Sequence, residues 1–216
     1  MSTTHRYPPQ VRIIDDPFTR NGLTRFCHAN TRQADVGSIT RSLYREVLLR
    51  HVINELFPRT AVVVATPMYK EQGNRGTIAA EVINPMTQVV VATLLRAGNI
   101  PSVACFSRLV SILNDGCVRH DFLGASRTTD AEHHVTGTAI TYQKSSPLAD
   151  RILLIPDPMG ATGCTITQVL ESYGPEEVAK ARAIATLHMI ISPEYIRRIT
   201  EMYPQIHIFT LRVDRG

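Results

Sequence analysis

The segment Arg151–Gly174, RILLIPDPMGATGCTITQVLESYG, joins a short apolar run, a loop of small residues and an amphipathic helix. The run Ile152–Ile155 is typical of a buried strand. Apolar side chains then recur at the spacing of one helical face, at Ile166, Val169, Leu170 and Tyr173. Because Gly174 and Pro175 end that helix, the segment predicts a strand, an acidic turn, a loop and a helix in this order.

The loop between strand and helix carries little side-chain bulk and reads Asp157-Pro158-Met159-Gly160-Ala161-Thr162-Gly163-Cys164-Thr165. A phosphate group needs backbone N–H donors, hydroxyls and the positive end of a helix, and this loop offers all of them. The Lys-Ser/Thr pair of a Walker A loop and the G-x-G-x-x-G spacing of a Rossmann fingerprint are both missing.

Asp157 is expected at the carboxyl end of the strand, beside the phosphate-binding loop. A carboxylate there is badly placed for a second phosphate, but it can accept hydrogen bonds from ribose hydroxyls. The pattern therefore indicates a sugar phosphate, with the 5′-phosphate in the loop and the diol on Asp157. The alternative interpretation is an ordinary strand-to-helix turn with a threonine that caps the helix.

These residues resemble a known family. DPMGATGCT is similar to the ribose-phosphate loop of the type I phosphoribosyltransferases, and proline after the aspartate resembles uracil phosphoribosyltransferase in particular. Leu94-Leu95-Arg96-Ala97-Gly98 resembles the family's strand-to-loop segment, and Ser126-Arg127 stands where the family has Tyr-Arg. The end of the chain, 203–216, resembles the family's last core strand. The resemblance extends from about Pro17 onward.

The resemblance implies an α/β fold, with a parallel central sheet flanked by helices and a small hood built from N-terminal segments. It implies transfer of 5-phosphoribosyl from phosphoribosyl pyrophosphate (PRPP) to uracil, giving UMP and pyrophosphate, in pyrimidine salvage by a homodimer. No dedicated metal ligands are implied, because Mg²⁺ would arrive on PRPP.

The resemblance also implies roles for individual residues. Asp157 would fix the ribose and favour an oxocarbenium-like state, Arg96 would clamp the pyrophosphate, and Arg127 would close over it. The 5′-phosphate would lie in the loop, on Pro158, Met159, Gly160, Ala161, Thr162, Gly163, Cys164 and Thr165. The base-binding residues are left open, although Asp214 resembles an aspartate near the family's base site.

Several positions depart from the family. Ser126 replaces the expected tyrosine, Gly160 replaces a bulkier apolar residue, and Cys164-Thr165 stand where Gly-Ser is usual. The expected helix at 42–57 has no clear match to the family's Tyr-Glu-Ala-Thr segment. The sequence also stops at Gly216, before the segment that binds the uracil edge in the family. A truncated chain, another mode of base recognition and a chain that does not bind uracil are all consistent with this end.

Two other functions remain open. The first is a non-catalytic relative that binds PRPP or a nucleotide as a sensor or partner subunit. The second is an RNA-binding pyrimidine regulator, which a pI of about 9.0 favours weakly. Because the arginines are spread along the chain rather than clustered, nucleic-acid binding is not indicated.

Length and composition predict one soluble domain. The 216 residues, 44% hydrophobic and 19% charged, suit a single core, which we place at 11–216 after a mobile polar tail at 1–10. The sequence has neither an apolar membrane span nor the apolar core of a secretory signal, so a cytoplasmic protein is expected. Four scattered cysteines, without any C-x-x-C pair, argue against a zinc site and a disulfide scaffold.

The remaining patterns predict the order of the elements. Helical spacing runs from Val36 to Leu56, with Asp35 or Ser38 as its cap. Strands are expected at 61–65 and 77–83, which could form the hood. A long polar loop is expected at 125–137, with a returning strand at 138–142. Parallel strands are expected at 89–95, 117–123, 151–156, 181–191 and 206–211, and helices at 103–113, 163–173 and 193–202.

Overall fold

The computed structural model describes residues 6–95, 97–129 and 135–214, with the side chains of 125–129 and 135–141 left out. Its main feature is a central sheet with the strand order β1-β10-β9-β7-β4-β5-β6. Neighbouring strands are parallel except β5 and β6, which are antiparallel. The strands are β1 (Val11–Ile13), β4 (Val89–Leu95), β5 (Val118–Thr129), β6 (Val135–Lys144), β7 (Ile152–Pro156), β9 (Ala183–Ile191) and β10 (Ile206–Val213).

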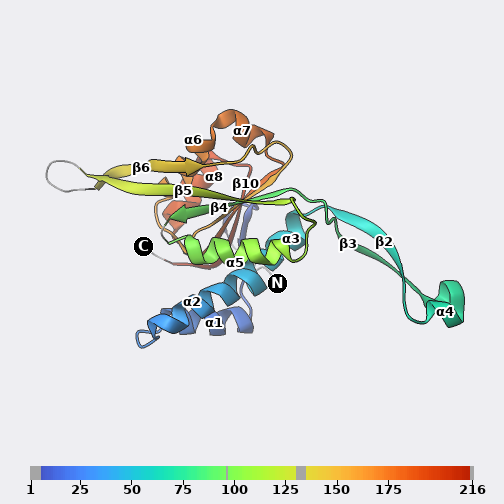
Figure 1. Cartoon of the computed structure of the whole chain (residues 1–216). Coiled ribbons are helices and arrows are strands. Elements are labelled where there is room, and N and C mark those ends of the chain that lie inside the picture. Colours follow the sequence, from blue (N-terminus) through green and yellow to red (C-terminus); the bar gives the residue numbers. More distant parts are fainter. Residues whose placement is uncertain (1–5, 96, 130–134, 215–216) are drawn as a thin grey trace.

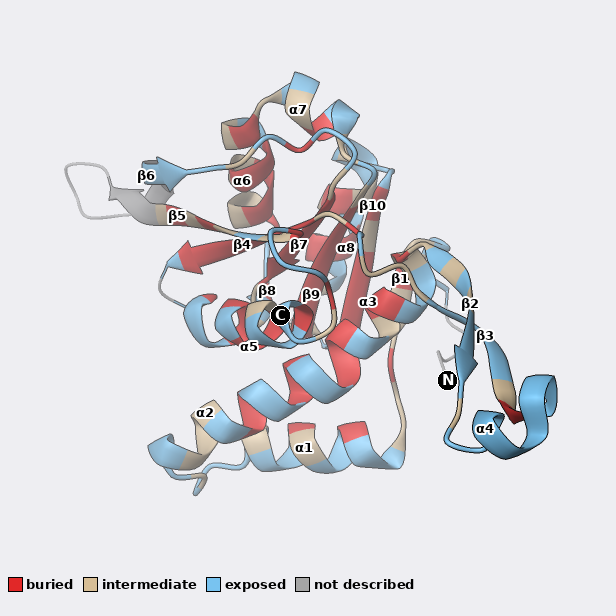
Figure 2. Ribbon diagram, turned by 45° about the vertical axis from the view of Figure 1, so that its right-hand side comes forward, coloured by how far each residue is buried: buried red, intermediate tan, exposed pale blue. Residues whose placement is uncertain are grey.

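Helices cover both faces of this sheet, as expected for an α/β protein (Figures 1 and 2). One face packs against α1 (Pro17–Cys27), α2 (Gln33–Ser42), α3 (Leu49–Leu56) and α5 (Asn99–Val110). The other face packs against α6 (Cys164–Tyr173), α7 (Pro175–Lys180) and α8 (Pro193–Met202). The expected α/β fold is confirmed.

The central strands are buried on both faces because their apolar residues alternate between two cores. In β7, Ile152 and Leu154 belong to the core under α5, whereas Leu153 and Ile155 belong to the core under α6. All four are fully buried. This is why the apolar run in the sequence shows no polar alternation, and why it was correctly assigned to a strand.

The N-terminal helical stretch is longer and less regular than expected. The predicted helix from Val36 onward is a continuous succession of α2, a π-helical segment at Leu43–Leu48, and α3. The helix begins at Gln33, and its cap is the backbone of Arg32 rather than Asp35 or Ser38. The preceding α1, capped by the Asp16 carboxylate, was not predicted. Tyr7 packs against the core, whereas residues 1–5 of the expected mobile tail lie outside the described part of the chain.

The expected hood is not where the sequence placed it. The two predicted strands exist as β2 (Arg59–Ala65) and β3 (Thr77–Ile83), and they pair in antiparallel fashion. They form an arm that projects from the body and carries α4 (Tyr69–Gln72) at its tip (Figure 1). Because β3 leads into the start of β4, the base of the arm lies at the amino ends of the parallel strands. The ligand was expected at their carboxyl ends.

The polar segment at 125–137 is also not a long loop. Strand β5 runs on to Thr129 and β6 starts at Val135, so the two form an extended hairpin. The threonine and valine residues of this stretch are good strand formers. The backbone therefore pairs across the hairpin although the stretch is mostly polar.

No helix in the described ranges has both the length and the apolar character that crossing a membrane requires.

We expect the buried carboxylate of Asp121 to hold this hairpin to the body. Asp121 accepts hydrogen bonds from the backbone N–H of Ser146 (2.7 Å), the Ser146 hydroxyl (2.7 Å) and the Tyr173 hydroxyl (2.6 Å). Asp121→Ala should lower the free energy of unfolding by about 2–4 kcal/mol in urea titrations, because it leaves buried donors unpaired. The exposed Asp115→Ala is the control, and an equal loss in both variants would contradict this role.

Candidate functional site

The loop after β7 is held along the edge of β9. The backbone N–H of Asp157 donates to the carbonyl of Leu187 (3.0 Å), and the carbonyl of Pro158 accepts from Met189 and Ile190. The short strand β8 (Met159–Gly160) then pairs with the end of β9. The loop therefore continues the sheet for several residues before it turns into α6, and the neighbouring strand fixes its path.

Two glycines make the turn into α6 possible. Gly160 is buried, and a Cβ atom there would lie 2.7 Å from Cδ2 of Tyr195 and 2.9 Å from Cγ2 of Ile191. Gly163 has a φ of +78°, in the left-handed region that suits glycine, and it directly precedes α6. Since glycine has no side chain to cap the helix, the positive end of α6 faces the loop uncovered.

The threonine that could have capped α6 does so only weakly. Thr162 Oγ1 accepts from the backbone N–H of Cys164 at 3.5 Å, which is at the limit of hydrogen bonding. Ala161 and Thr162 are exposed, and Thr165 is partly exposed. The geometry thus offers backbone donors and hydroxyls around one helix end, which is the arrangement that binds phosphate groups in other folds.

Asp157 stands where the sequence placed it, directly after β7. Its side chain is partly buried, and this desolvation raises the pKa of the carboxyl to about 6, against the opposing effect of a hydrogen bond from the backbone N–H of Met159. A carboxyl group whose pKa is shifted by burial beside such a loop is a candidate for a functional role.

The loop after β4 approaches Asp157 from the next strand. A Cβ atom on Gly98 would lie 2.8 Å from the carbonyl oxygen of Leu94 and 3.0 Å from that of Pro156, so only glycine allows this approach. Arg96, the expected pyrophosphate ligand, is outside the described residues. Its neighbours on both sides place the β4–α5 loop against the end of β7.

Arg127 lies on β5, opposite Thr138 of β6. Leu95, the last residue of β4, pairs with Gly124, so the backbone of Arg127 extends beyond the end of β4. Its side chain is outside the described part of the structure. The segments that contain Arg127 and Asp157, and the loop that follows β4, thus all lie at the carboxyl ends of neighbouring strands.

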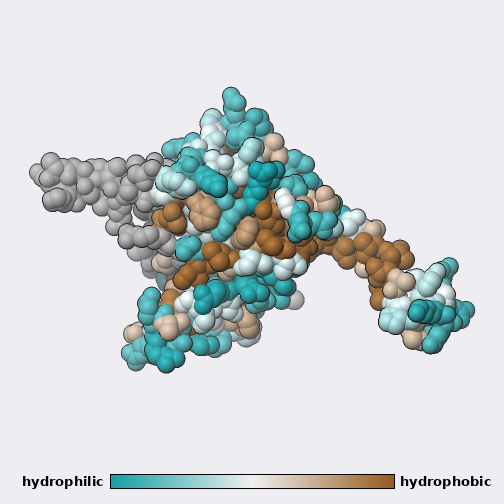
Figure 3. Space-filling model, in the orientation of Figure 1, coloured by the Kyte–Doolittle hydropathy of each residue, from teal (hydrophilic) through white to brown (hydrophobic). Residues whose placement is uncertain are grey.

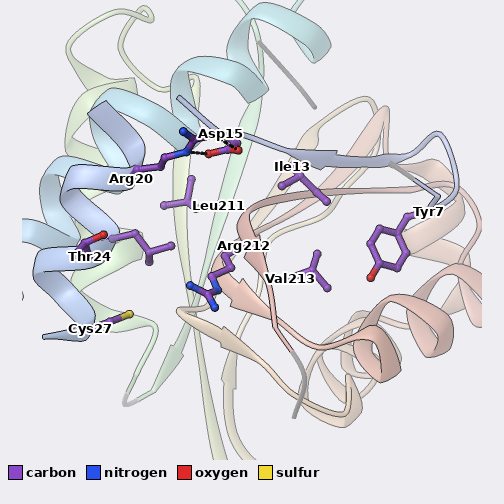
Figure 4. Close-up of a pocket in the computed structure, with 10 residues that line it drawn as sticks. Tyr7, Ile13, Asp15, Arg20, Thr24, Cys27, Leu211, Arg212 and Val213 are labelled. Carbon is purple, nitrogen blue, oxygen red and sulfur yellow. Dashed lines mark hydrogen bonds and ion pairs between the residues drawn. The ribbon is translucent and has the colours of Figure 1, made fainter. Parts of the chain in front are cut away.

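Asp214 lies at the end of β10, two strands away from β7. Its backbone N–H donates to the carbonyl of Ile191 (2.9 Å), and its carboxylate forms an ion pair with Arg212 (3.1 Å). Close by, a cavity of about 610 Å³ opens between α1 and the ends of β1 and β10 (Figure 4). Its lining includes Arg212 and the ion pair of Arg20 with Asp15, but no residue of the phosphate loop.

Three residues near the loop were not identified as site residues from the sequence. His188 and Tyr195 are fully buried beneath it, and Arg198 donates to the Cys164 sulfur at 2.5 Å. The available signals were a lone histidine in the apolar run of β9 and an arginine on the inner side of α8. Both signals are weak without knowledge of the fold.

Within the described ranges, no group of three or more histidine, cysteine, aspartate or glutamate residues could hold a metal ion. His133 and His134 lie outside those ranges.

The raised pKa of Asp157 predicts a pH-dependent cost in stability. A raised carboxyl pKa stabilises the folded state below about pH 4, and this stability is lost as the pH rises through about 6. Asp157→Asn should therefore unfold with a free energy higher than that of the wild type by on the order of 2 kcal/mol at pH 8, and by much less at pH 4. Urea titrations at both pH values test this, with the exposed Asp115→Asn as control. A difference that does not change with pH would contradict the assignment.

Comparison with known proteins identifies the family of the chain. The family model for uracil phosphoribosyltransferase matches residues 13–216. A curated uracil phosphoribosyltransferase from Mesorhizobium japonicum is 25% identical over 207 residues, covering 95% of this chain and 88% of its own length. Another from Thermococcus gammatolerans is 27% identical over 215 residues, covering 100% and 88%.

Among solved structures, the AQ2163 protein from Aquifex aeolicus superposes with a TM-score of 0.72 at 20% identity, over 95% of this chain and 88% of its own. At this identity the superposition supports the fold alone. The family match covers nearly the whole chain, from β1 to the end of the sequence. The chain therefore belongs to the uracil phosphoribosyltransferase family.

Proposed function

We propose that this chain transfers the 5-phosphoribosyl group of PRPP to N1 of uracil, releasing UMP and pyrophosphate in the cytoplasm. The observation that supports this best is the position of Asp157. Asp157 follows β7 directly, the loop after it leads into the start of α6, and its neighbour Pro156 lies against Gly98 of the loop after β4. In the proposal the ribose diol binds Asp157, the 5′-phosphate binds at the start of α6, and the pyrophosphate binds at the loop after β4.

In the proposed reaction, N1 of uracil forms a bond to C1 of the ribose while the bond from C1 to the pyrophosphate oxygen breaks. The proton of N1 is released, and the electron pair of the broken bond leaves with the pyrophosphate. Positive charge develops on the ribose and negative charge on the leaving group. The protein therefore acts by positioning and by electrostatic stabilisation rather than by covalent chemistry.

The residue roles follow from this charge distribution. The carboxylate of Asp157 holds the ribose hydroxyls and favours positive charge on the ring. The backbone N–H groups of 161–165, with the hydroxyls of Thr162 and Thr165, hold the 5′-phosphate. Arg96 binds the pyrophosphate, and Arg127 closes over it and excludes water that would hydrolyse PRPP.

The residues also fit the Mg²⁺ that phosphoribosyltransferases use with PRPP. Mg²⁺ keeps several waters and takes one or two protein oxygens in addition to phosphate oxygens. A single partly buried carboxylate at Asp157 suits this arrangement. When bound, the ion would neutralise charge on the pyrophosphate, whereas the positioning of the ribose depends on the chain itself.

Asp157→Asn is the sharpest test of this function. We expect the rate of pyrophosphate release from PRPP and uracil to fall by about 10²–10³-fold, because the charge that favours the transition state is lost while the shape is kept. The wild-type rate should rise from pH 5 to pH 7 with the ionisation of Asp157 at about pH 6. Because PRPP phosphates titrate in the same range, the pH profile of the residual activity of Asp157→Asn supplies the substrate's own contribution.

Other outcomes would reassign the protein. Binding of PRPP by calorimetry without turnover on any base would indicate a sensor or partner subunit. Turnover with a purine alone would overturn the choice of uracil but not the reaction class. Salt-dependent binding of RNA in the absence of turnover would favour the regulator.

The arm supports the proposal that the chain forms a homodimer. Strands β2 and β3 expose apolar side chains, among them Val63 (71% exposed), Ile78 (54%) and Val64 (51%). Figure 3 shows the resulting hydrophobic surface along the arm. A lone two-stranded ribbon is marginally stable in water, so an apolar arm of this kind needs a surface to cover it. We propose that the surface is a second copy of the chain.

Val63→Glu should convert this dimer into a monomer, because the variant buries a charge in the interface. Analytical ultracentrifugation at micromolar concentration measures the change in mass. Val103→Glu, at an exposed apolar position on α5, is the matched control and should keep the mass of the wild type. A wild-type protein that sediments as a monomer would contradict the proposed assembly.

A further inference from the structure

A buried chain of polar side chains supports the phosphate loop from below. His188 Nδ1 lies 2.7 Å from the carbonyl oxygen of Asp157, and His188 Nε2 lies 2.7 Å from the hydroxyl of Tyr195. That hydroxyl lies 3.0 Å from Thr186 Oγ1. All three side chains are fully buried. None of them has a role in the reaction described above, and buried polar groups that are fully hydrogen-bonded rigidify their surroundings.

The direction of each hydrogen bond follows from two facts. Complete burial lowers the pKa of His188 to about 3, so the ring is neutral and carries one proton. The carbonyl of Asp157 can only accept, so this proton must lie on Nδ1. Nε2 then accepts from the hydroxyl of Tyr195, which in turn accepts from the hydroxyl of Thr186. A single tautomer satisfies every partner.

Tyr195 also contacts the loop through its ring. The ring fills the space in which any side chain on Gly160 would lie, with 2.7 Å between a Cβ at Gly160 and Cδ2 of the ring. Position 160 is one at which this chain departs from the bulkier apolar residue of the family. The ring cannot move aside freely, because its hydroxyl is bound to His188 and its ring packs edge-on against the imidazole at a centroid distance of 4.6 Å.

We propose that His188 and Tyr195 are positioning residues of this protein, which hold the backbone of Asp157 and Gly160 in the geometry that binds PRPP. The proposal rests on the proposed function for its ligand. His188 holds the carbonyl of Asp157, and Tyr195 packs on the loop three residues later. The loop is thereby organised before the substrate arrives, and PRPP does not have to order it on binding.

Tyr195→Phe tests the proposal, since it removes one hydroxyl and keeps the ring against Gly160. The loop contacts the ribose phosphate in the ground state and the transition state alike. We therefore expect the KM for PRPP to rise by about tenfold while kcat changes by less than about threefold. Tyr173→Phe is the matched control. It removes another buried hydroxyl of the same core, bonded to Asp121 at the far end of α6. Because Asp121 keeps its two hydrogen bonds from Ser146, the hairpin stays anchored and the KM should not change.

A second pair of variants separates positioning from simple stability. His188→Asn keeps an N–H group close to the place of Nδ1, whereas His188→Leu removes it. We expect His188→Asn to retain most of the affinity for PRPP and His188→Leu to lose at least as much as Tyr195→Phe. Equal KM values in the two His188 variants, measured well below their melting temperatures, would overturn the proposal.

Two measurements need no substrate. Imidazole ¹⁵N shifts should show neutral His188 with its proton on Nδ1 in the wild type. Amide hydrogen exchange at 157–164 should be faster in Tyr195→Phe than in the wild type, and unchanged in Tyr173→Phe. A proton on Nε2, or unchanged exchange in Tyr195→Phe, would overturn the proposal. Failure of the wild type to bind PRPP would overturn the proposed function instead, and these two readouts would still decide on the network.

Discussion

Strand β9 acts as the template for the loop on which the site depends. It accepts the N–H of Asp157, donates to the carbonyl of Pro158, and pairs with Gly160 through β8. The same strand supplies His188, whose Nδ1 lies 2.7 Å from the carbonyl oxygen of Asp157. Tyr44, from the π-helical segment, adds a hydroxyl to the carbonyl of Leu187 (3.1 Å). A flexible loop of small residues thus becomes a rigid one, because its backbone groups are satisfied by a strand that is buried on both faces.

The chemistry of the loop could be predicted from the sequence because it depends on neighbours in the chain. The strand, the loop and the helix of 151–174 follow one another directly, and their patterns are local. The supporting network could not be predicted in this way. His188 lies 31 residues from Asp157, and Tyr195 meets Gly160 only because α8 folds back over the loop. The departure at Gly160 was visible in the sequence, but its complement at Tyr195 became visible only in the fold.

The fold shows the same division between local and long-range information. Buried strands such as β7 and β10 were found from their apolar runs. The strands expected at 117–123 and 138–142 lie in β5 and β6, but the outer part of their hairpin was taken for a loop, because its threonine-rich sequence lacks the alternation that burial imposes on one face. Strands β2 and β3 were found, but the hood they were expected to form is a projecting arm, since their pattern indicates strands and not the direction in which they leave the body. Direction is set by the connection from β3 to the start of β4.

That connection separates two regions of the molecule along a single strand. The amino end of β4 receives the arm, and the loop after its carboxyl end brings Gly98 against Pro156, next to Asp157. Six of the seven residues of β4 are buried. A substitution on the arm cannot displace the carboxylate without deforming this rigid segment. Substitutions on the outer ribbon are therefore expected to change the assembly of the chain while the residues around the ribose keep their geometry.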